Sequence, residues 1–136
     1  MKRKTSLQRG PAAEEVLGAG SPPVLNPRDR CMDVARTAAL VAGLDLVVTV
    51  DTMVAHLAGA LGRPCWVLLR HEPDWRWPQA GTAAPWYPAT RQYRQAAPGD
   101  WSAPLARLRA DLALLAGGRD HAAEPSPGTL GREGGL

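Results

Sequence analysis

The feature that most restricts the fold of this chain is an alternation of helical and strand patterns between residues 33 and 69, joined by short connections. Residues 46–50 and 65–69 are apolar runs without polar alternation, as in strands that are covered on both faces. Each run follows a segment with apolar residues at helical spacing, residues 34–44 and 54–61. The alternation predicts an α/β fold with an open, doubly wound and mostly parallel sheet.

Local residues predict where these helices begin and end. Asp33 is placed to cap the first helix. Asp51 and Thr52 supply capping chemistry for the second helix, whose expected apolar face is Val54, Leu57, Ala58 and Leu61. Gly62 and Pro64 end that helix, so the second strand begins directly after it.

Composition divides the chain into three parts. Residues 1–30 are broken by Gly and Pro, so we expect an irregular start with a short strand and a short helix. Residues 31–116 contain the periodic apolar residues and all five tryptophans, and form the predicted lobe. Residues 117–136 are rich in Gly, Pro and charge, which predicts a disordered tail.

The last part of the predicted lobe contains a long loop, a strand and a helix. The loop follows Arg70 and is rich in aromatic residues and proline. One more short strand is expected at residues 90–94 and a closing helix at residues 101–115. The leucines that would form one stripe on this helix are Leu105, Leu108, Leu112 and Leu115.

Charge, cysteines and hydropathy exclude several classes of protein. The net charge is +3, but the four basic residues that precede the first acidic residue leave the rest of the chain slightly acidic. This distribution argues against a nucleic-acid surface. Cys31 and Cys65 lie far apart without metal-ligand spacing, so no disulfide, metal or other cofactor is expected. Without a signal peptide or a membrane span, the sequence predicts a soluble, cytoplasmic protein.

The turn after Val50 is the predicted ligand site. In open α/β sheets, ligands bind beyond the carboxyl ends of the strands, where a helix N-terminus offers unpaired N–H groups. Thr52 places a hydroxyl at the helix start, and His56 follows one turn later on the same face. A pyrophosphate fits this set. The alternative is that Asp51 or Thr52 only caps the helix and that His56 is a surface residue.

The aromatic loop also has two interpretations. Trp75, Trp77 and Trp86 offer rings that stack on a sugar or a base, but large rings in a long loop more often form the loop's own small core. Arg76 lies between two of these tryptophans and is expected to be a stacked structural cation rather than a ligand contact.

A set of motifs extends over roughly residues 5 to 115. They are SLQRGPA at 6–12, DVARTAAL at 33–40, LDLVV at 44–48, VDT at 50–52, VAHLAGALGRP at 54–64, WVLL at 66–69, PDWRW at 73–77, PWYP at 85–88 and GDW at 99–101. Together they resemble the C-terminal lobe of the heptosyltransferase-like glycosyltransferases, family 9, in the form often fused to tetratricopeptide repeats.

This resemblance implies a two-lobed GT-B enzyme with Rossmann-like lobes, of which this chain has only the C-terminal one. In such enzymes the C-terminal lobe holds a nucleotide-diphospho-sugar, and the N-terminal lobe supplies acceptor contacts and the catalytic base. By position, Asp51 would contact the donor sugar, Thr52 and the amide of Met53 the phosphates, and His56 either the phosphates or the sugar.

Some residues implied by the resemblance lie in a different loop, and others differ from the family pattern. Gln8 and Arg9 belong to the loop that approaches the phosphates from the facing strand. Met53 stands where the family usually has Gly or Ser, so its side chain is expected to crowd the pyrophosphate. Arg36 replaces an acidic residue, and the basic residues 1–4 replace the apolar half of the lobe's first strand.

The resulting hypothesis is a truncated, donor-binding lobe that needs a separate N-terminal lobe or a repeat protein as a partner and catalyses no transfer alone. The alternative is a non-catalytic interaction module or gene remnant that keeps the fold without binding a ligand. Met53 and the basic start favour this alternative, whereas Thr52 and His56 favour retained binding.

Overall fold

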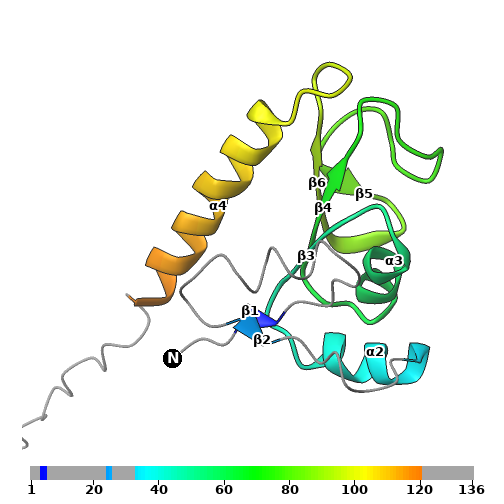
Figure 1. The fold of residues 1–136 in the computed structure, drawn as a ribbon, viewed down its shortest axis with the longest axis vertical. Coiled ribbons are helices and arrows are strands. Elements are labelled where there is room, and N and C mark those ends of the chain that lie inside the picture. The colour runs from blue at the N-terminus through cyan, green and yellow to red at the C-terminus, as the bar shows by residue number, and fades with distance from the viewer. Residues whose placement is uncertain (1–3, 6–23, 26–32, 121–136) are drawn as a thin grey trace, which may run out of the picture. The chain divides into compact units, whose positions relative to one another are not determined.

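The structure is a computed structural model that describes residues 4–5, 24–25 and 33–120. The chain forms two units, residues 1–40 and residues 41–136, and each is considered by itself. Figure 1 labels the helices and strands.

In the first unit, two short strands form a parallel pair. β1 (Lys4–Thr5) lies beside β2 (Val24–Leu25), with Lys4 opposite Val24. The expectation of a single strand before residue 31 was therefore wrong. The helix expected in the same part of the chain would lie outside the described residues.

Helix α2 (Val34–Ala42) begins as the sequence predicts. The backbone N–H of Arg36 donates to Asp33 Oδ1 at 2.7 Å, which is the bond of a helix N-cap. The Thr37 hydroxyl donates to the Asp33 carbonyl at 2.8 Å. The helix ends next to Gly43, and the cap was predicted.

A four-stranded mixed sheet forms the centre of the second unit. Its strand order is β3-β4-β6-β5, and its strands are β3 (Val47–Val50), β4 (Cys65–Leu69), β6 (Tyr87–Arg94) and β5 (Ala83–Ala84). The first three are mutually parallel, and β5 pairs antiparallel with β6. The parallel core was predicted, with β4 at its observed bounds; β6 is longer than expected, and β5 was not predicted.

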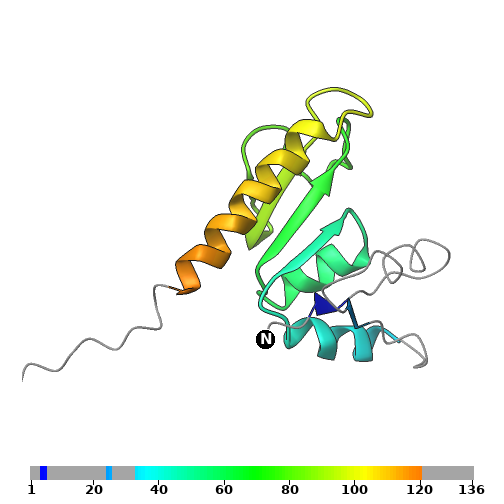
Figure 2. The ribbon, with the colours of Figure 1, turned by 60° about the vertical axis from the view of Figure 1, so that its left-hand side comes forward.

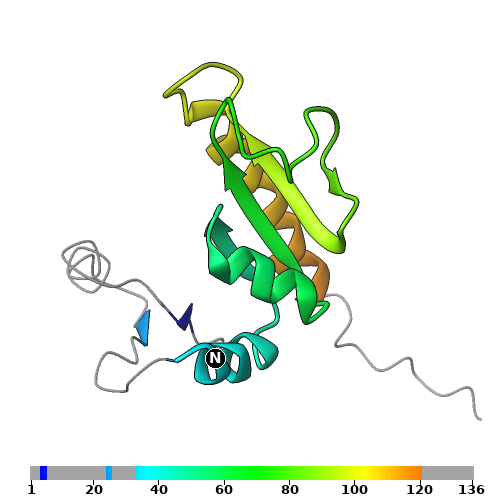
Figure 3. The ribbon, with the colours of Figure 1, turned by 90° about the vertical axis from the view of Figure 1, so that its right-hand side faces the viewer.

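Two helices lie on opposite faces of this sheet. Figure 3 shows α3 (Met53–Ala60) in front of the strands and α4 (Ser102–Asp120) behind them. α3 contacts β3, β4 and β6, whereas α4 lies along β6 (Figure 2). Successive side chains of β4 point to opposite faces of the sheet, so the two helices face different side chains of this strand. Cys65, Val67 and Leu69 are buried, and the two residues between them are half-buried.

The coverage of β3 differs from the prediction. Val48 and Val50 are 45% and 49% exposed, so the expectation of a strand covered on both faces was wrong. Their register partners in β4 are Trp66 and Leu68, which are half-buried. The helix on that face contacts β6 and leaves β3 open, which an apolar run in the sequence does not reveal.

The faces predicted for the two helices were only partly correct. The buried residues of α3 are Ala55 and Ala58, whose small side chains allow the helix to approach the strands closely. Leu61, which directly follows the helix, is 42% exposed. In α4 only Leu108 of the predicted leucine stripe is buried. α4 also continues to Asp120, past the expected start of the tail at residue 117, and the rest of that tail lies outside the described residues.

A polar cluster fixes α4 to β6. The Tyr93 hydroxyl donates to Asp111 Oδ2 at 2.8 Å, and Arg91 Nη2 lies 3.0 Å from the same oxygen. Arg91 and Arg107 place their guanidinium groups over the Tyr93 ring, 5.5 and 5.9 Å from its centroid. Burial and the Asp111 hydrogen bond raise the pKa of Tyr93 to about 12.

No helix in the described part of the chain has both the length and the apolar character needed to cross a bilayer.

The Tyr93 hydroxyl gives a testable pH dependence. Because the folded state raises the pKa of Tyr93 from 10.0 to about 12, the unfolded chain loses this proton first, and the free energy of unfolding should fall as the pH rises from 10 to 12. Tyr93→Phe should lower the free energy of unfolding by about 1 kcal/mol near neutral pH and remove this part of the alkaline decline. Urea unfolding at several pH values measures both effects.

Tyr87→Phe is the matched control because it removes the chain's other tyrosine hydroxyl, and it should keep the decline between pH 10 and 12. An identical decline in the wild type and in Tyr93→Phe would show that Tyr93 is not its cause.

Candidate functional site

The turn between β3 and α3 contains a threonine hydroxyl that does not cap the helix. Thr52 occupies the N-cap position of α3 in an extended conformation, but its side chain makes no capping hydrogen bond. Its hydroxyl instead lies 3.2 Å from the Thr49 hydroxyl and donates to the Val50 carbonyl at 3.3 Å. The expectation that Asp51 or Thr52 caps this helix through its side chain was therefore wrong for Thr52, because groups at the strand end compete for its hydroxyl.

The first backbone N–H groups of α3 are available to a ligand. Helical bonding begins with the N–H groups of Ala55 and His56, which donate to the Thr52 carbonyl at 3.0 and 3.5 Å. Those of Met53 and Val54 precede these bonds, as at any helix start. The first turn contains no acidic residue, and the helix dipole adds partial positive charge there. The side chain of Met53 is 53% exposed beside these groups.

His56 connects this turn to an aromatic cluster. Its Nε2 lies 3.5 Å from Asp51 Oδ1, and its Nδ1 lies 3.2 Å from the Tyr87 hydroxyl. Its ring stacks on Trp77, with centroids 5.5 Å apart. The structure thus brings the predicted residues Asp51 and His56 together, with Thr52 and Met53 at the intervening helix start. Gln8 and Arg9, the other two predicted residues, lie outside the described residues.

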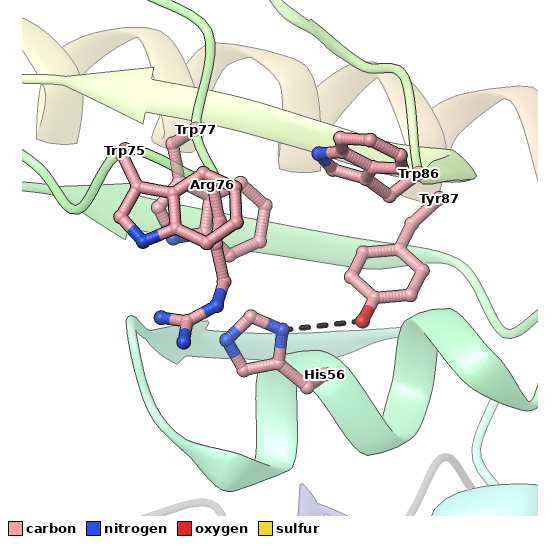
Figure 4. Close-up of a pocket in the computed structure, with 6 residues that line it drawn as sticks. All are labelled: His56, Trp75, Arg76, Trp77, Trp86 and Tyr87. Carbon is pink, nitrogen blue, oxygen red and sulfur yellow. Dashed lines mark hydrogen bonds between the residues drawn. The ribbon is translucent and has the colours of Figure 1, made fainter.

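A cavity of about 260 Å³ opens beside His56. Figure 4 shows its lining, which consists of His56, Trp75, Arg76, Trp77, Trp86 and Tyr87. The residues come from α3, from the loop after β4, from the turn before β6 and from the first residue of β6, so segments distant in sequence form one site.

The tryptophans of the loop divide into two kinds. Trp77 is 2% exposed and belongs to the core, whereas Trp75 and Trp86 are 78% and 66% exposed. The interpretation of all three rings as the loop's own core was therefore correct only for Trp77. Arg76 is a stacked cation as predicted, with its guanidinium 5.2 Å from the Trp75 ring centroid and 2.9 Å from Asp74.

Gly59 permits the close contact between α3 and Tyr87. A Cβ atom at this position would overlap the Tyr87 ring. Tyr87 can therefore lie against the helix and reach His56 one turn earlier. Sequence reasoning did not single out Gly59, although a glycine inside a helical pattern is a signal of close packing.

Arg94 attaches the loop to the sheet. Its guanidinium donates to the carbonyl of Gln79 at 2.9 Å and also to the carbonyl of Pro78. Burial lowers the pKa of Arg94, so these bonds help to keep a desolvated cation in place. Near the start of the loop, Gln95 Oε1 accepts from the N–H of His71 at 3.1 Å.

Within the described residues, His, Cys, Asp and Glu form no group of three that could hold a metal ion. Cys65 is a buried free thiol, and burial raises its pKa to about 11. It therefore remains protonated at neutral pH and is not a nucleophile.

Comparison with protein families matches residues 31–100 to glycosyltransferase family 9 (heptosyltransferase). The chain belongs to this family. The matched part includes β3, α3, the turn between them and the whole lining of the cavity. The family implies a GT-B, Rossmann-like fold, and the small mixed sheet with its helices is consistent with that α/β class. No curated protein and no solved structure matches the chain.

Gly59→Ala tests whether close packing on α3 builds the site of this family 9 chain. Alanine normally stabilises a helix by up to about 1 kcal/mol relative to glycine. At Gly59 the overlap with Tyr87 should outweigh this gain and lower the free energy of unfolding by about 1–2 kcal/mol. The Tyr87 ring should also leave His56, which imidazole and ring resonances report by NMR.

Gly117→Ala in α4 is the matched control because a Cβ there meets nothing within 4 Å. It should be neutral or stabilising. Equal stabilisation by both substitutions would show that Tyr87 does not need the glycine.

Proposed function

We propose that this chain is the donor-binding lobe of a glycosyltransferase and that the turn after β3 holds a nucleotide-diphospho-sugar. Membership of family 9 supports a sugar-donor ligand. The observation that carries the assignment to this turn is the set of available N–H groups at the start of α3 beside a hydroxyl that does not cap the helix. Such a helix start attracts phosphate.

The charges around the turn suit different groups to the phosphates and to the sugar of the donor. The N–H groups of Met53 and Val54, together with the Thr52 hydroxyl, suit the phosphate oxygens. The Asp51 carboxylate repels phosphate, so we place it against sugar hydroxyl groups, which donate hydrogen bonds to carboxylates. His56 keeps Asp51 in place through the 3.5 Å contact.

The exposure of the turn supports a partner surface. Asp51, Thr52 and Met53 are all exposed. Glycosyl transfer requires the donor and acceptor to be held together while water is excluded. We therefore propose that an N-terminal lobe, or a repeat protein in its place, closes over this turn and supplies the catalytic base. By itself the lobe binds the donor without transferring the sugar.

A second candidate function is an interaction module that keeps the fold without binding a donor. The exposed side chain of Met53, at a position beside the phosphate-facing N–H groups, favours this alternative.

A titration with uridine, adenosine and guanosine diphosphates tests the donor site. At least one of them should shift the backbone amide resonances of residues 51–56, with a dissociation constant near 1 mM, which corresponds to about 4 kcal/mol of binding free energy. Thr52→Val should weaken binding about tenfold because a hydrogen bond to a charged group is lost. Its effect on stability should be small, since the hydroxyl does not cap the helix. Met53→Gly should strengthen binding by clearing the approach.

Thr82→Val is the matched control, since it makes the same substitution at an exposed threonine outside the turn. If no diphosphate shifts these amides in the wild type or in Met53→Gly, the donor site is absent and the interaction module is the better description.

A further inference from the structure

We propose that the cavity beside His56 is a binding site for a single sugar ring, with Trp75 and Trp86 as its stacking surfaces. This inference rests on the proposed function for the neighbouring turn. It assigns a ligand to the residues that line this cavity, five of which the proposed phosphate site does not use.

The two exposed indoles support a ligand because both present aromatic rings beside the cavity, and one of them is held by a neighbouring side chain. Trp75 is 78% exposed and Trp86 is 66% exposed, so both present large apolar rings to solvent. Trp75 is nevertheless fixed by Arg76, which stacks on it and pairs with Asp74. A rigid aromatic surface at the mouth of a cavity loses little entropy when a flat apolar ligand face covers it.

The rings at the bottom of the cavity are also held in place. Trp77 is 2% exposed and stacks on His56, whose Nδ1 meets the Tyr87 hydroxyl 3.2 Å away. These three rings are packed against one another at centroid distances of 5.5 to 6.5 Å, so they form the floor. The cavity therefore exists before a ligand arrives.

The shape and polarity of the cavity favour a sugar over a nucleobase. A volume of about 260 Å³ is slightly below the usual range for small-molecule sites, about 300–1,000 Å³, and accommodates one ring. A sugar ring has an apolar C–H face for the indoles and hydroxyl groups around its edge. The lining of the cavity has hydrogen-bonding groups in Arg76, His56 and Tyr87.

The cavity lies within reach of the donor turn. His56 is the fourth residue after Thr52, and four steps along a helix are about 6 Å. A ring in the cavity is thus either the sugar of a donor whose phosphates lie at the start of α3, or a ring of a separate saccharide placed next to it. Both sources present the same chemistry to the indoles.

The indole N–H resonances of the full chain test this proposal by NMR. The probes are the methyl glycosides of glucose, galactose, mannose and N-acetylglucosamine, with uridine and adenosine as base probes. At least one glycoside should shift the indole resonances of Trp75, Trp77 and Trp86. Trp66 and Trp101 do not line the cavity and should remain unchanged, which makes them internal controls.

Variants test which side chain binds the ring. Trp75→Ala should weaken glycoside binding at least fivefold, and Trp75→Phe should weaken it less because an aromatic face remains. Leu114→Ala is the control, since Leu114 is 74% exposed on α4 and does not line the cavity. It should leave the affinity unchanged.

Two results would overturn the proposal. One is the absence of any indole shift with all four glycosides, and the other is a shift with uridine or adenosine but with no glycoside, which would assign a base site. Failure of the phosphate site remains separate, because it is measured by uridine diphosphate at the amides of residues 52–54.

A competition experiment with uridine diphosphate glucose and the other nucleotide-sugars then distinguishes the two sources. Displacement of a bound glycoside supports the donor's own sugar as the occupant. Simultaneous binding supports a separate saccharide.

Discussion

The attachment of the loop to the sheet through Arg94 is the interaction on which the candidate site depends. The guanidinium reaches the carbonyls of Pro78 and Gln79 from the end of β6. These carbonyls follow Trp77 in the chain, and the Trp77 ring stacks on His56 of α3. A desolvated cation needs such partners, so the loop and the strand stabilise each other. Without this attachment the loop that carries Trp77 would lose its bonds to the end of β6.

Helix α3 then connects two kinds of chemistry within eight residues. Its first turn offers N–H groups and partial positive charge to phosphate, and its middle carries His56 into the aromatic cavity. Gly59 lets Tyr87 approach close enough to bind His56. One short helix thereby holds the proposed phosphate-binding turn and the proposed ring-binding surface in a fixed relation, which is what a nucleotide-sugar or a donor beside an acceptor requires.

The sequence predicted those features that depend on neighbouring residues. The Asp33 cap, the bounds of β4 and the turn after Val50 follow from local patterns, and the structure agrees with them. Features set by distant segments were not predictable. The direction of the Thr52 hydroxyl depends on the strand end, and the burial of Trp77 depends on its packing against His56. Residue patterns also do not say which strand a helix will cover, so the exposed face of β3 was missed.

The most direct test of the donor site removes one backbone N–H group without altering the helix. Met53 is the first residue of α3, where proline is well tolerated, and Thr52 before it is already extended, as a residue preceding proline must be. The measurement is the broadening of the ³¹P resonances of uridine diphosphate by the wild-type chain, by Met53→Ala and by Met53→Pro. We expect Met53→Ala to bind at least as well as the wild type and Met53→Pro to bind about tenfold more weakly. Equal broadening by both variants would contradict phosphate binding at this turn.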